Sequence, residues 1–91
     1  MALFSLRTAG TLLAGVGASH FVAPTAYEPL TASVFPNDTR SWVYRNGATE
    51  LALGLGLRSR KSALRKLSIA GVGAYLLMLG ANAAKNSGEQ I

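Results

Sequence analysis

The sequence has no cysteine, few charged residues and a single histidine. The absence of cysteine excludes disulfide bonds, thiol redox chemistry, cysteine-ligated iron–sulfur clusters and Cys-type zinc sites. Charged residues are 14% of the chain, well below the roughly 25% of an average soluble domain, whereas 49% are hydrophobic. At 91 residues the chain is long enough for one small domain, and its composition is typical of a membrane protein.

The hydrophobic residues are gathered into charge-free runs. No formal charge lies between Arg7 and Glu28, and none lies between Lys66 and Lys85. A helix needs about 20 residues to cross a bilayer, and a helix of a small soluble protein would show polar residues on one face at every turn. These runs predict helices that span a membrane.

We therefore expect an all-α integral membrane protein with three transmembrane helices in a single domain, residues 1–91. The predicted parts are helix one over 3–23, an interfacial segment over 24–37, helix two over 38–57, a basic loop over 58–66, helix three over 67–84 and a polar tail over 85–91. The interfacial segment contains all three prolines, which exclude one straight helix, so a short helix over 27–33 at the outer surface is expected. A retained first helix is favoured over a cleaved leader because its apolar run continues past the small residues.

A dense basic cluster fixes the expected orientation. It consists of Arg58, Arg60, Lys61, Arg65 and Lys66. Cations between two apolar segments indicate a cytoplasmic loop, which also lies close to anionic lipid headgroups. We expect a bacterial inner (plasma) membrane protein with its N-terminus in the cytoplasm and its C-terminus outside. Aromatic residues are absent from the cluster, so nucleic acid is not an expected partner.

Small residues recur at helical spacing in all three predicted membrane helices. They are Gly10, Ala14 and Gly17 in the first, Gly47 and Gly54 in the second, and Gly73 and Gly80 in the third. Small residues on one face let the backbones of membrane helices approach closely. These residues are therefore the predicted helix-packing positions.

The polar residues of the apolar segments are the candidates for chemistry. Helical rise places His20, Arg45, Glu50 and Asn82 in the outer half of the membrane, where they could form one polar cluster. A charged Glu50 there costs several kcal/mol unless it is paired, protonated or hydrated. Two interpretations stay open for Glu50: a structural hydrogen-bonding group, or a site for a proton or a quinone headgroup. No catalytic or metal-binding motif is present, and no cofactor is expected beyond a quinone or lipid near this cluster.

The motifs resemble those of DoxX-like small membrane proteins, including related families of unknown function. The resemblance rests on Gly17, His20, Phe21 and Pro24, then on Gly47, Glu50 and Leu51, and finally on Ala81 and Asn82. It implies a membrane helix bundle, here a three-helix variant that lacks a fourth helix after Asn82. Some members of that family resemble subunits of thiosulfate:quinone oxidoreductases or accompany other redox proteins.

Three hypotheses for function follow. The leading one is a small non-catalytic accessory subunit of a larger membrane complex, respiratory or redox-linked, whose partners are other integral membrane subunits and lipids. The alternative is a quinone-linked redox or proton-relay component that uses Glu50. A further alternative is an accessory protein for lipid or solute transport. No complete active site is present, so an enzyme is not favoured.

Overall fold

The described part of the protein is built from four α-helices. The computed structural model describes residues 5–89. Its helices are α1 (Leu6–Val22), α2 (Pro24–Val34), α3 (Thr39–Leu57) and α4 (Ser62–Glu89). The all-α prediction is confirmed. The predicted start of the first helix at residue 3 and the last two residues of the polar tail lie outside the described residues.

Local chemistry explains where α1 ends and α2 begins. The Ser5 side chain caps the start of α1, since its Oγ accepts a hydrogen bond of 3.1 Å from the backbone nitrogen of Thr8. α1 ends ahead of Pro24, because the residue before a proline avoids helical dihedral angles. Pro24 then occupies the first turn of α2, where its missing N–H costs nothing. The chain therefore turns here instead of continuing as one long helix.

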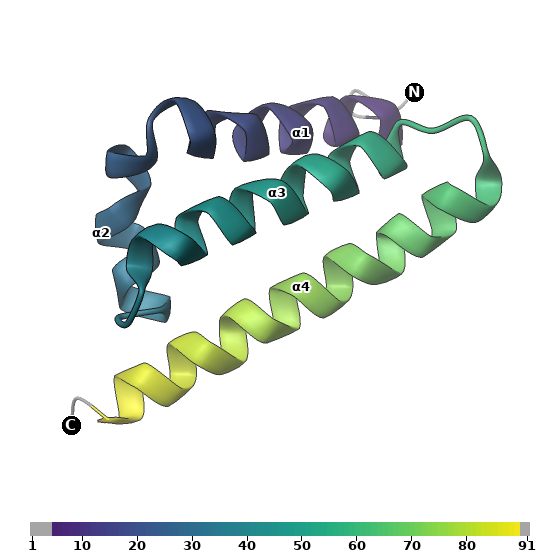
Figure 1. Ribbon diagram of the computed structural model, residues 1–91. Coiled ribbons are helices and arrows are strands. Elements are labelled where there is room, and N and C mark those ends of the chain that lie inside the picture. The colour runs from purple at the N-terminus through teal and green to yellow at the C-terminus, as the bar shows by residue number, and fades with distance from the viewer. Residues whose placement is uncertain (1–4, 90–91) are drawn as a thin grey trace.

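The interfacial segment folds into α2, which crosses the end of the molecule formed by α1 and α3 (Figure 1). Its 11 residues extend beyond the short helix expected over 27–33. An ion pair ties α2 to the first turn of α3, with Arg40 Nη2 at 2.6 Å from Glu28 Oε2. α2 thus closes one end of the helix group, and the connection between α3 and α4 lies at the other end.

α1 and α3 lie side by side at very short range, and this contact is the core of the fold (Figure 1). A Cβ atom added to Gly10 would lie 2.5 Å from the carbonyl oxygen of Gly54. Glycines of the two helices therefore face each other with no room for a side chain. Ala14 and Val43 are buried in the same interface. The small residues predicted for packing in these two helices are thus used within the chain.

α4 packs differently. Over the described residues its Cα atoms come within 8 Å of those of α3 and α2 but not of those of α1, and it lies farther from α3 than α1 does (Figure 1). A Cβ atom added at Gly73 or Gly80 would meet no atom within 4 Å. The predicted packing role of these two glycines therefore has no counterpart within this chain, because α4 turns that side away from the other helices.

The basic loop is shorter than predicted. It was expected over 58–66, but α4 already begins at Ser62. Ala, Leu, Arg and Lys, which fill the following positions, are strong helix formers. The Arg65 side chain also folds back, and its Nη1 donates to the carbonyl oxygens of Ser59, at 3.0 Å, and Arg60, at 2.9 Å. The helix therefore takes up half of the expected loop.

α4 is the one described helix that is long and apolar enough to cross a membrane. The part of α4 that could span a membrane, Ser62–Asn86, has 25 residues, and only 6% of its most apolar segment is buried inside the molecule. It includes the predicted third helix over 67–84 and runs beyond it at both ends. The longest dimension of the molecule, 44 Å, exceeds the roughly 30 Å hydrocarbon core of a bilayer. The all-α part of the prediction is thus confirmed, whereas among the described residues one helix, not the predicted three, is long and apolar enough to span a membrane.

Candidate functional site

The last turn of α1 places His20 against α3. The imidazole is 5% exposed, and its Nδ1 lies 2.8 Å from the carbonyl oxygen of Val16 in the preceding turn. The space that it occupies depends on Gly47, because a Cβ atom there would lie 2.5 Å from the Cβ of His20. A glycine in α3 therefore allows a histidine of α1 to be buried between the helices.

Glu50 follows one turn after Gly47 and faces the same imidazole. Its Oε2 lies 3.8 Å from His20 Nε2, and the carboxylate side chain is 13% exposed. The hydroxyl of Tyr75 in α4 donates to the same oxygen at 2.6 Å. Three helices thus contribute one polar group each to a cluster in which His20 is buried and the other two are half-buried, and we call it the His–Glu–Tyr cluster: His20, Glu50 and Tyr75.

Tyr27 of α2 covers the other side of the histidine. Its ring stacks on the imidazole with a centroid distance of 3.8 Å and an interplanar angle of 14°. Its hydroxyl is hydrogen-bonded to Ser19 Oγ at 2.5 Å. The imidazole is therefore held by Val16 at one edge and by Tyr27 on one face, so its remaining nitrogen has a fixed direction.

A cavity of about 230 Å³ lies beside the cluster. Its polar lining consists of His20, Tyr27, Thr31, Asn46, Glu50 and Tyr75, and its apolar lining of Val16, Leu30, Val34 and Leu79. Asn46 and Thr31 are each 7% exposed. Both side chains line the cavity, and among the described residues no buried side-chain nitrogen or oxygen atom lacks a hydrogen-bond partner. The cavity therefore combines polar groups with apolar walls.

The hydrogen bonds define which atoms can take a proton. The Val16 carbonyl can only accept, so Nδ1 of His20 donates and carries the proton. A neutral imidazole then presents Nε2 as an acceptor towards Glu50 and the cavity. At 3.8 Å the two groups are too far apart for a direct hydrogen bond. One proton on either group would leave the pair without net charge.

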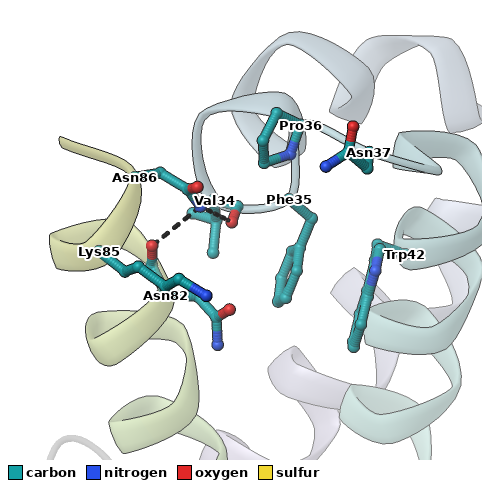
Figure 2. A pocket seen from close by; sticks show the side chains of 8 residues that line it. All are labelled: Val34, Phe35, Pro36, Asn37, Trp42, Asn82, Lys85 and Asn86. Carbon is teal, nitrogen blue, oxygen red and sulfur yellow. Dashed lines mark hydrogen bonds between the residues drawn. The ribbon is translucent and has the colours of Figure 1, made fainter. Parts of the chain in front are cut away.

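The other two residues of the predicted polar cluster lie elsewhere. Arg45 is exposed, and its guanidinium lies over the ring of Trp42 at 4.9 Å from the centroid. Asn82 lines a separate cavity of about 280 Å³ near the end of α4 (Figure 2). Its Nδ2 donates to the Met78 carbonyl at 2.9 Å. The structure brings together His20 and Glu50 but not these two, because Asn82 lies about two turns beyond Tyr75 along α4.

Figure 2 shows how α4 meets the α2–α3 connection at this second cavity. Asn86 Nδ2 donates to the carbonyl oxygens of Val34, at 2.5 Å, and Asn82, at 2.9 Å. The rings of Phe35 and Trp42 stack on the opposite wall at 3.9 Å. The amide of Asn86 thus connects α4 to the end of α2, which is a structural role.

The remaining charged residues lie at the two ends of the molecule. The hydrogen bond to the Glu28 carboxylate raises the pKa of the exposed Arg40 guanidinium above its usual value. The basic residues of the loop region are exposed except for Arg65, which is half-buried: Arg58, Arg60, Lys61, Arg65 and Lys66. The charges are thus separated from the His–Glu–Tyr cluster by apolar helix surface.

Comparison with known families gives one match. The model of DUF8561, a domain of unknown function, matches residues 9–86. The chain belongs to the DUF8561 family. The predicted membership of the DoxX-like family is therefore wrong, because its motifs are short and depend on glycines, which are frequent in membrane helices generally. No curated protein and no solved structure matches the chain.

The DUF8561 region includes the whole His–Glu–Tyr cluster and the cavity beside it. Sequence reasoning missed Tyr75, Tyr27 and Thr31. A signal was present for Tyr75, since a tyrosine hydroxyl inside a charge-free run needs a partner. No comparable signal pointed to Thr31.

Within the described residues, no group of three metal-ligating side chains is close enough to hold an ion.

Proposed function

We propose that this DUF8561 protein is an integral membrane protein in which α1, α3 and α4 span the bilayer and α2 lies at the outer surface. Apolar side chains on the outward faces of all three long helices support this arrangement. Leu12 and Leu55 are each 55% exposed, and Leu77 is 76% exposed. The basic loop then lies in the cytoplasm under the positive-inside rule. In this arrangement lipid covers the apolar faces, and the His–Glu–Tyr cluster lies within the membrane.

We propose further that the protein binds a small ligand in the cavity and exchanges a proton with it through His20 and Glu50. The observation that carries this proposal is the 3.8 Å separation between His20 Nε2 and Glu50 Oε2 at the wall of a cavity. Both groups can change protonation state, and both line the cavity, so one ligand could contact them together. Proton transfer requires donor and acceptor within hydrogen-bond reach or joined through one intervening group.

A purely structural role explains less of the site. The hydrogen bond from Tyr75 would be enough for a carboxyl group that only holds helices together. It leaves unexplained why His20, Asn46 and Glu50 line a single cavity together with apolar side chains. A bound ligand with one polar and one apolar part would contact both kinds of wall.

The single histidine of the chain makes proton sharing measurable. We expect Glu50→Gln to change the ¹⁵N chemical shift of His20 Nε2, since it removes the one acidic group facing that atom. The measurement is NMR of protein labelled with ¹⁵N-histidine in detergent micelles without added ligand. Glu28→Gln is the matched control, because Glu28 pairs with Arg40 at the end of the molecule.

The control should leave the His20 signals where they are in the unmodified protein. An Nε2 signal that is the same in Glu50→Gln and in the unmodified protein would show that the two groups share no proton. That result would contradict the proposed function. Circular dichroism on each variant checks that the helices are retained.

A second candidate, an accessory subunit of a larger membrane complex, is favoured by the open face of α4. Exposed small residues follow this face at helical spacing: Ala70, Gly73, Ala74, Gly80, Ala81 and Ala84. Such a face can pack closely against a helix of another subunit. Purification in mild detergent that yields the chain without any second subunit would contradict this candidate.

A further inference from the structure

The polar end of the cavity is rich in acceptors. His20 Nε2 presents a lone pair when the ring is neutral, because Nδ1 donates to Val16. Glu50 presents carboxylate oxygens, and the nearest hydroxyl, that of Tyr75, is already donated to one of them. A ligand that satisfies this end must therefore bring a hydrogen-bond donor of its own.

The charge of the lining restricts the ligand further. No lysine or arginine lines the cavity, and its one acidic group is Glu50. An anionic ligand would be repelled by the carboxylate and would find no fixed cation. With one proton shared between His20 and Glu50 the site has no net charge, and it then fits an uncharged ligand.

Size and wall chemistry favour a single ring. A cavity of about 150 Å³ lined by apolar side chains is large enough for benzene. The cavity here measures about 230 Å³, which leaves room for one substituted six-membered ring. Leu30, Val34 and Leu79 form apolar walls, and the Asn46 amide and Thr31 hydroxyl are available at the ring edge.

The cavity lies where the four helices meet, since residues of all four line it. Over the described residues no Cα atom of α1 lies within 8 Å of a Cα atom of α4. Val16 of α1 and Leu79 of α4 line the cavity from these two helices, so an apolar substituent on the ring would find an apolar wall on each.

We propose that the cavity binds an uncharged phenol, whose hydroxyl donates to His20 Nε2 and whose ring lies between the apolar walls. This inference rests on the proposed function: the proton that the pair already holds lies on Glu50, which leaves His20 Nε2 free to accept the hydrogen bond from the phenol. The hydroxyl is the feature that the site selects. The methyl ether of the same phenol has nearly the same shape but cannot donate a hydrogen bond.

The experiment compares these two compounds on the ¹⁵N-histidine-labelled protein in detergent micelles. 4-Butylphenol should shift the His20 Nε2 signal in a saturable way, and with about tenfold higher affinity than 4-butylanisole, which is the order expected for one buried hydrogen bond. Leu79→Trp, which fills the cavity, should abolish the shift. Leu77→Trp is the matched control, because Leu77 is 76% exposed on the same helix, and it should bind as the unmodified protein does.

Equal affinity for the phenol and its ether would overturn the proposal, since binding would then be apolar partition alone. Undiminished binding to Leu79→Trp would overturn it as well. If Leu79→Trp does not fold, Asn46→Leu is used instead. We expect this variant to bind 4-butylphenol more weakly than the unmodified protein does, and an unchanged affinity would contradict the proposal. The two proposals can fail separately. If 4-butylphenol does not bind but Glu50→Gln still changes the His20 signal of the ligand-free protein, the proposed function stands and only phenols are excluded as its ligands.

Discussion

At the scale of single residues, glycine determines how α1 and α3 meet. A Cβ atom added to Gly17 would clash with backbone atoms of Gly47 and Leu51, whereas one added to Gly15 would meet nothing within 4 Å. Backbone atoms cannot move aside as the end of a flexible side chain can. The two glycines lie two residues apart on one helix, yet only one of them is required for packing.

We expect Gly17→Ala to lower the free energy of unfolding by about 1–3 kcal/mol, the usual cost of overpacking. Gly15→Ala should instead raise it by up to about 1 kcal/mol, because alanine is the better helix former. Thermal unfolding of both variants in the same detergent, followed by circular dichroism, gives the comparison. Equal stability of the two variants would mean that the α1–α3 contact is looser than described here.

Sequence patterns predicted one part of the His–Glu–Tyr cluster but not all of it. Helical spacing was enough to place Gly47 and Glu50 on one face of α3 and to point that face towards another helix. It was not enough to find Tyr75, which lies 25 positions from Glu50 in the sequence. Contact between them depends on how α4 is rotated about its own axis, and a nearly uniform apolar helix carries little information about rotation.

At the scale of elements, the boundary set by proline was predictable, whereas the boundary set by side-chain hydrogen bonds in the basic loop was not. Pro24 separates α1 from α2 as expected, because its effect on the preceding residue is local. The start of α4 at Ser62 was missed, since the side chain of Arg65 satisfies carbonyl groups of the preceding turn. The positive charge of Arg65 can be recognised as a topology signal from the sequence, but its hydrogen bonds to carbonyl groups of the loop are visible only in the structure.

α4 is the element on which the subunit hypothesis depends. We expect Gly80→Leu to reduce co-purification of a partner subunit in mild detergent, because the added side chain would prevent close approach of a second helix. Gly15→Leu on α1 is the matched control, since Gly15 also faces open space, and it should have no effect. Quantitative mass spectrometry of the purified material measures both. Equal yields of partner with the two variants would exclude the α4 glycine face as the docking surface.

At the scale of the whole molecule, the proposed orientation places the two ends of the helix group on opposite sides of the membrane. The basic connection between α3 and α4 lies at one end, and α2 lies at the other (Figure 1). With a longest dimension of 44 Å, the molecule can reach both interfaces of a bilayer.

The absence of cysteine makes this orientation testable with single thiols. We expect Ser62→Cys to react with a membrane-impermeant maleimide only from the cytoplasmic side, and Asn37→Cys only from the outside. Labelling of intact cells and of inverted membrane vesicles, read by gel shift, distinguishes the two sides. Reaction of both thiols from the same side would rule out an odd number of spans between them.

The weak attachment of α4 has a kinetic consequence. α4 supplies Tyr75 and Leu79 to the cavity, yet over the described residues none of its Cα atoms lies within 8 Å of α1. Local opening requires least free energy where packing is sparse. For the proposed ligand we therefore expect α4 to be the wall that moves on entry and exit. That movement would break the hydrogen bond from Tyr75 to Glu50, so the carboxyl group would change its hydrogen-bond partner at each arrival and departure.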